Sequence, residues 1–206
     1  MMLAALLLVI QAGGAAQDPR LERLDPETRS AVVSVLDSAR AVGLPSEPLI
    51  QRALEGATKG AAGPRIVGAV RRLAADLGTA RTALGARTSA PELEAGVAAL
   101  RAGAAPAVLA RLRDARRPPL TMALAVLADL VTSGVPVDSA ATIVLALAPN
   151  ARDAELVEFR RAVERDISLG APPGAAASVR ALNTGIRMGT SDLGTGAPPP
   201  RPASRP

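Results

Sequence analysis

The sequence predicts an all-α protein of about eight short antiparallel helices, arranged as helical hairpins, with a flexible C-terminal tail. Ala, Leu and Val dominate the 49% of residues that are hydrophobic, and Ala has the highest helix propensity. Pro, Gly and capping residues divide the chain into segments of helical length. No segment alternates apolar and polar residues as a half-buried strand does. The hairpins are therefore expected to form an irregular bundle or a short α-solenoid-like array.

The residues that start and stop helices define each element. Asp25 and Pro26 are typical of the N-cap and the first helical position, and Gly43 is typical of the residue just after a helix. Ser89 and Glu92 predict a capping box. Asn150 is expected to cap the last of the eight helices. In order, the expected helices are 26–42, 46–59, 64–84, 89–102, 106–117, 120–133, 137–148 and from 150 to about residue 169.

Apolar spacing indicates which helices are most buried. The third helix has one continuous stripe at alternating spacings of four and three: Ile66, Val70, Leu73, Leu77, Ala80 and Leu84. The seventh helix, 137–148, is apolar nearly all round, so it is predicted to be the best-buried element. The apolar stretches 120–131 and 140–148 are shorter than the roughly 20 residues of a membrane span. A buried hairpin is therefore favoured over a transmembrane one.

Two parts of the chain resemble each other, residues 26–84 and 119–169. Val35-Leu36 followed by Gly43-Leu44-Pro45 matches Val126-Leu127 followed by Gly134-Val135-Pro136 at the same spacing. A looser echo surrounds Gly103. The pattern predicts a repeated hairpin, in which Gly ends one helix and Pro prevents its continuation. The alternative is that an Ala-rich helical protein reuses the same helix stop without any duplication.

The two ends of the chain differ from the helical domain predicted for residues 17–170. Residues 1–16 are typical of a signal peptide, with an apolar run from Leu3 to Ile10 and small residues before Gln17. No basic residue precedes that run, and a buried N-terminal helix is the alternative. Residues 171–206 are rich in Gly and Pro and predict a disordered tail, with a short helix near 175–187 as an interruption. The expected location is therefore secreted or periplasmic.

The absence of reactive side chains limits the chemistry of this protein. The chain contains no His, Cys, Trp or Tyr, one Phe and one Lys, so it lacks the usual bases, thiolates, zinc ligands and base-stacking rings. Lys59 is the only partner for a Ser–Lys pair, but its place at a helix end explains it as a partner of the helix dipole. The sequence predicts no enzyme, no cofactor and no metal site.

Paired carboxylates could still support a hydrolase. The densest acidic group is Asp153, Glu155, Glu158, Glu164 and Asp166. Arginines lie between these residues, and Arg160 and Glu164 have the spacing of an i, i+4 ion pair. This pattern is typical of a solvated helix face, and a glycan cleft would also need aromatic side chains. A hydrolase is therefore the third and least favoured function.

Positive charge is concentrated in the middle of the chain. Residues 61–120 hold ten arginines and four acidic residues, whereas residues 121–170 hold four arginines and seven acidic residues. An anionic surface or polymer could bind this segment between Arg65 and Arg117 through phosphate or carboxylate groups. The densest group gives the candidate contact residues, Arg111, Arg113, Arg116 and Arg117. Internal pairing or simple solvation of these charges is the alternative.

These observations favour an exported, non-enzymatic module of the bacterial cell envelope that binds a protein or a second copy of itself. Electrostatic binding to an anionic envelope surface or polymer is the second hypothesis. Sequence-specific binding of nucleic acid is not expected, because no DNA-binding helix motif stands out and Phe159 is the only aromatic residue of the chain. After cleavage of the signal peptide, the chain is not expected to be an integral membrane protein.

Overall fold

The computed structural model describes residues 18–191, with side chains through residue 184. Within this range the chain is all-helical, with nine α-helices, one short 3-10 helix and no strand, which confirms the predicted fold class. The predicted signal peptide, 1–16, lies outside the described residues. The elements are η1 (Pro19–Arg23), α1 (Pro26–Ala41), α2 (Glu47–Thr58), α3 (Gly63–Leu84), α4 (Ala90–Ala102), α5 (Pro106–Ala115), α6 (Thr121–Thr132), α7 (Val137–Leu147), α8 (Asp153–Ser168) and α9 (Pro173–Ser191).

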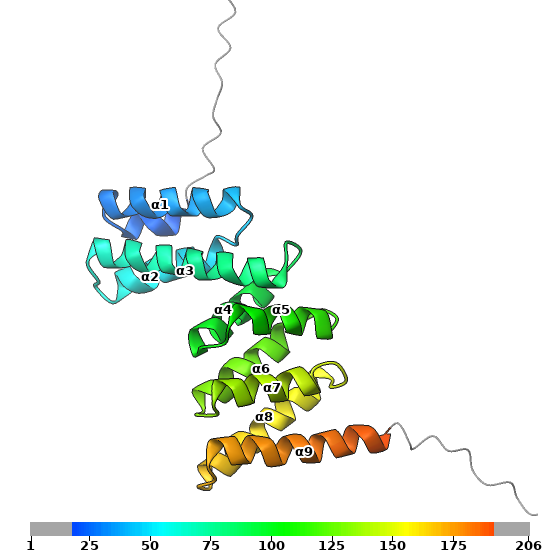
Figure 1. Cartoon of the computed structure of the whole chain (residues 1–206). Helices are drawn as coiled ribbons and strands as arrows, with labels where there is room; N and C mark the ends of the chain where they lie inside the picture. Colours follow the sequence, from blue (N-terminus) through cyan, green and yellow to red (C-terminus); the bar gives the residue numbers. More distant parts are fainter. Residues whose placement is uncertain (1–17, 192–206) are drawn as a thin grey trace, which may run out of the picture. The chain divides into compact units, whose positions relative to one another are not determined.

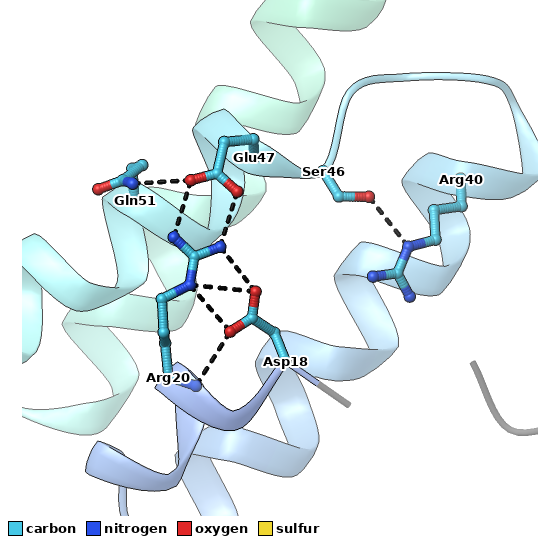
Figure 2. A network of polar contacts seen from close by, with 6 residues as sticks. All are labelled: Asp18, Arg20, Arg40, Ser46, Glu47 and Gln51. Carbon is cyan, nitrogen blue, oxygen red and sulfur yellow. Dashed lines mark hydrogen bonds and ion pairs between the residues drawn. The ribbon is translucent and has the colours of Figure 1, made fainter. Parts of the chain in front are cut away.

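The chain divides into two compact units, one ending at Ala74 and the other beginning at Ala75. In the first unit, η1 packs against α1 and α2. A polar network fixes this contact, because Arg20 binds Asp18 at its own end of η1 and both carboxylate oxygens of Glu47 on α2, at 2.7 and 2.9 Å (Figure 2). Gln51 donates to the same Glu47 at 2.7 Å (Figure 2). These hydrogen bonds lower the pKa of Glu47 to about 2.

The second unit is a stack of helical hairpins (Figure 1). The hairpins α4/α5, α6/α7 and α8/α9 follow one another along the chain. Helix α6 packs between α4 and α8, while α7 packs between α5 and α9. The unit therefore has two layers of helices, and the main contacts of each hairpin are with the hairpins next to it, as in an α-solenoid.

The turn inside each hairpin has the same backbone structure. Gly103, Gly134 and Gly170 follow α4, α6 and α8 with φ of 111°, 92° and 97°, a region that favours glycine. The amide of the next residue donates to the carbonyl five residues earlier, at 3.0 Å in all three turns. This is the Schellman ending of a helix. The looser echo seen around Gly103 is thus a turn of the same kind, and the structural repeat of this unit is the two-helix hairpin.

Two glycine-to-alanine substitutions should have opposite effects on stability. A Cβ at Gly170 or at Gly78 would meet no atom within 4 Å, but Gly170 has positive φ and Gly78 lies inside α3. Gly170→Ala should lower the free energy of unfolding by about 1 kcal/mol. Gly78→Ala should raise it by up to about 1 kcal/mol because alanine favours the helix. Urea unfolding followed by circular dichroism measures both, and equal signs would contradict the turn described.

Helix α6 is the best-buried element of the second unit, and not α7 as the sequence predicted. Six side chains of α6 are buried, compared with four on α7. Both helices lie between two others in their layer, but α6 packs extensively against α4 and α8, whereas α7 makes only a small contact with α5. The apolar composition of α7 on all its sides does not indicate how closely other helices pack against it. No helix within residues 18–191 is long and apolar enough to span a membrane.

The other predictions for single helices are mostly confirmed. The apolar stripe of α3 is buried at all six positions, and α4 begins with the predicted capping box. Asn150 is not the cap of α8, which begins at Asp153. Glu155 Oε2 instead accepts from the Arg152 amide at 2.7 Å, so a carboxylate in the first turn satisfies the amide that precedes the helix.

The predicted tail, 171–206, is corrected in its first part. Residues Pro173–Ser191 form α9, which extends beyond the short helix expected at 175–187. Ala176 and Ala177 are buried, because α9 packs against both α7 and α8. These contacts stabilise a segment whose composition predicted disorder. Residues 192–206 lie outside the described range.

Candidate interaction surface

Helix α9 has one side that packs against the rest of its unit. Ala176 and Ala177 are 4% and 0% exposed. Arg180 turns toward α8, where its Nε and Nη2 donate to the two carboxylate oxygens of Asp166 at 2.6 and 2.7 Å. This two-pronged ion pair lowers the pKa of Asp166. The basic residue in the middle of α9 is therefore already paired.

The opposite side of α9 is apolar and uncovered. Val179 and Leu182 are 55% and 68% exposed, and Ala175 is exposed as well. Because a helix turns by about 100° per residue, these three positions lie roughly opposite Ala177. We call them the α9 face. Their spacing of four and three residues is that of the buried stripes elsewhere in the chain.

The α9 face lies at the open end of the hairpin stack. A Cβ at Gly103 would lie 3.4 Å from Val137 of α7, and one at Gly134 would lie 3.3 Å from Pro173 of α9. Each of these turns is thus covered by the first residues of a later helix. A Cβ at Gly170 would meet nothing within 4 Å, and the adjacent Leu169 is 80% exposed. The described part of the chain provides no further hairpin to cover this end.

A solenoid that ends in water normally has a polar outer face on its terminal repeat. Here three of the four large apolar side chains that are exposed in the described part of the chain belong to the last hairpin: Leu169, Val179 and Leu182. The fourth, Val42, lies in the first unit. A cluster of this kind marks a contact surface more often than isolated exposed residues do.

The four arginines predicted to contact an anionic surface have different surroundings. Arg116 is mostly buried, with only 13% of its side chain exposed. Its guanidinium donates to the Ala148 carbonyl at 2.8 Å and pairs with Asp153. Arg113 donates to the Ala83 carbonyl at 2.8 Å and pairs with Asp114. Arg111 and Arg117 are exposed. Within residues 18–191, neither of these two has an ion-pair partner.

Each acidic residue of the candidate hydrolase group pairs with an arginine. The pairs are Asp153 with Arg116, Glu155 with Arg152, Glu158 with Arg161, Glu164 with Arg160, and Asp166 with Arg180. The predicted i, i+4 pair of Arg160 and Glu164 is confirmed at 3.7 Å. No group of three or more potential metal-ligating acids forms within the described residues. The arrangement is that of a salt-bridged helix surface.

Lys59 lies at the C-terminal end of α2, as its place in the sequence indicates. Its Nζ is 2.6 Å from Glu55 Oε1, and 70% of its side chain is exposed. The hydrogen bond from Lys59 also lowers the pKa of Glu55. A catalytic Ser–Lys pair requires a lysine that is withdrawn from water beside a hydroxyl, whereas Lys59 is exposed and binds a carboxylate.

The sequence contained a signal for the α9 face that composition obscured. Ala175, Val179 and Leu182 already have helical spacing, but the surrounding Gly and Pro residues predicted disorder. The sequence also gave no sign that Glu92 is buried, because its role as a capping residue explained its presence fully.

Comparison with known proteins identifies no relative, since no family model, curated protein or solved structure matches the chain.

Proposed function

We propose that the protein is a non-enzymatic interaction module, exported to the bacterial cell envelope, and that it binds another helical protein through the α9 face. The observation that carries this proposal is the uncovered apolar side of α9 at the open end of the stack. The apolar run and small residues at the N-terminus support export. The scarcity of reactive side chains supports a binding role rather than catalysis.

The hairpin stack also indicates what kind of partner fits. Helix α9 packs on α7 in the layer in which α7 packs on α5, so a further helix in that layer would lie on the α9 face. The buried residues of α7 and α9 include small aliphatic side chains such as Ala140, Val144 and Ala177. The partner should therefore present a helix lined with Ala, Val and Leu, without a charge at the centre of the contact.

The energy of this contact sets its minimum size. Full burial of a Val or Leu side chain stabilises by about 1.5 to 3 kcal/mol, and Val179 and Leu182 have roughly half to two thirds of their surface left to bury. Together they contribute about 2 to 4 kcal/mol, whereas micromolar affinity needs about 8 kcal/mol. The partner must therefore also cover neighbouring surface, such as the exposed Leu169.

The test compares Val179→Glu/Leu182→Glu with the matched variant Val42→Glu. Val42 is 63% exposed and lies in the first unit, so its replacement adds a charge at an apolar surface position away from the α9 face. The immobilised protein should recover one stoichiometric partner from solubilised envelope, and the double variant should weaken that binding at least tenfold because the contact would bury two unpaired carboxylates. Val42→Glu should bind normally.

Three results would contradict the proposal. They are partner binding that survives the double variant, equal loss with Val42→Glu, and a purified protein that is strictly monomeric and recovers no partner. Light scattering on the purified chain decides whether the occupant is instead a second copy. A dimer that dissociates on Val179→Glu/Leu182→Glu would assign the α9 face to self-association.

A further inference from the structure

A second surface of the same unit carries two arginines without counter-ions. Two connecting segments, residues 85–89 after α3 and residues 116–120 after α5, are held together by hydrogen bonds at or next to both of their ends. At one end, Arg113 donates to the Ala83 carbonyl at 2.8 Å. At the other, Glu92 accepts from the Leu120 amide at 2.8 Å and from the Ser89 amide and hydroxyl at 3.0 and 2.7 Å.

Arg87 and Arg117 lie between these two points of attachment. Arg87 is two residues from Ser89, and Arg117 is three residues from Leu120, so both belong to the two segments that these hydrogen bonds hold together. Both are exposed. In the described part of the chain, neither makes a hydrogen bond or an ion pair, whereas the neighbouring Arg113 and Arg116 are bound to carbonyls and carboxylates. We call these two residues the Arg87–Arg117 patch.

The nearby carboxylates do not neutralise this patch. Glu92 is 6% exposed and its two oxygens accept three hydrogen bonds. Burial raises the pKa of Glu92, but the hydrogen bonds from Leu120 and Ser89 lower it by more, so its pKa lies below the ordinary value. Glu92 is therefore held as a carboxylate, and these hydrogen bonds already compensate its charge. Asp114 pairs with Arg113 at 2.8 Å. Two exposed guanidinium groups therefore remain available for an anion.

We infer that the Arg87–Arg117 patch binds the phosphodiester groups of an anionic phospholipid surface. A guanidinium presents paired N–H donors that match a phosphate, and it keeps its charge at any pH of interest. Two exposed charges bind a single dissolved anion weakly. A dense layer of anionic headgroups attracts several exposed arginines at once, so a lipid surface is the phosphate source that such a patch fits. The chain's one aromatic ring, Phe159, is buried, which removes base stacking as an alternative.

The test uses vesicles and a pair of variants with equal net charge. Arg87→Glu/Arg117→Glu and Arg71→Glu/Arg72→Glu each lower the formal net charge from +5 to +1, and the residues of the second pair are exposed arginines of the first unit. Vesicles of phosphatidylcholine with and without phosphatidylglycerol are sedimented with the full chain at low and at physiological salt. Circular dichroism confirms that both variants remain helical.

The native protein should bind only the vesicles that contain phosphatidylglycerol, and binding should fall steeply with salt. The Arg87→Glu/Arg117→Glu variant should bind at least tenfold more weakly, while the Arg71→Glu/Arg72→Glu variant should change less than threefold. Soluble inorganic polyphosphate should displace the protein only at concentrations far above those of the lipid phosphate.

Equal losses in the two variants would overturn the inference, because net charge alone would then explain binding. Salt-independent binding, or no binding to phosphatidylglycerol, would overturn it as well. Displacement by polyphosphate at equal phosphate concentration would replace the lipid surface by a soluble phosphate polymer. Val179→Glu/Leu182→Glu should leave vesicle binding unchanged. A failure of lipid binding by the Arg87–Arg117 patch can therefore be told apart from a failure of the proposed protein contact at the α9 face.

Discussion

Glu92→Ala is expected to lower the free energy of unfolding by about 3 kcal/mol. The carboxylate joins the first turn of α4 to the residue that precedes α6, through its contacts with Ser89 and the Leu120 amide. Alanine would leave that amide without its acceptor in a buried position, and such a donor costs about 1 to 3 kcal/mol. Urea unfolding at pH 7, followed by circular dichroism, measures the loss.

Glu94→Ala is the matched control for this prediction. Glu94 is an exposed glutamate on the same helix, and its replacement should change the stability by less than about 0.5 kcal/mol. If both variants lose the same stability, the role of Glu92 between α4 and α6 is wrong.

The effect of Glu92→Ala should also depend on pH. The pKa of Glu92 in the folded protein lies below its ordinary value of 4.5, so the folded state favours the charged form. The stability that this preference contributes is fully present above pH 4.5 and is lost as the pH falls through the folded-state pKa. The difference between native protein and variant should therefore be constant from pH 7 to about pH 5.5 and shrink in more acidic solution. A difference that grows on acidification would contradict the assignment.

Leu127→Ala is expected to cost about 3 to 4 kcal/mol. Leu127 is 0% exposed on α6, the helix that packs against α4, α7 and α8. Removing three carbon atoms there leaves a cavity among side chains from several hairpins, and the surrounding helices can close it only partly. Thermal or urea unfolding of the variant provides the measurement.

Leu182→Ala provides the same chemical change at a position that is 68% exposed. It should change the stability of the purified protein by less than about 0.5 kcal/mol. A large loss at Leu182 in the monomer would show that the α9 face is covered, which would also remove the basis of the proposed interaction. A small loss at Leu127 would contradict the central place of α6.

The features that the sequence predicted well are those decided by neighbouring residues. Asp25 accepts from the Thr28 amide at the start of α1, as its position before Pro26 indicated. Gly43 and Gly134 end helices with positive φ for the same local reason. Helix ends depend on hydrogen bonds within about five residues, so a single sequence carries enough information to place them.

The features that the sequence missed depend on residues far apart in the chain. The composition of residues 171–191 gave no indication that Ala176 and Ala177 would find a place against α7 and α8. The group Arg111, Arg113, Arg116 and Arg117 looked uniform because its members are close in sequence. Arg116 is set apart by carbonyls and a carboxylate more than 30 residues away, and Arg87 joins Arg117 only through contacts between two connecting segments.

The single phenylalanine makes the second unit separately observable. Phe159 is the chain's sole aromatic ring, and it is 3% exposed on α8 in the core of that unit. Methyl groups stacked over its ring should give NMR signals shifted to high field, and no other side chain in the chain can produce such shifts. Their disappearance on heating would follow the melting of one unit alone, while circular dichroism follows the helices of both. A chain that is almost silent at 280 nm thus contains an internal probe for asking whether its two units melt together.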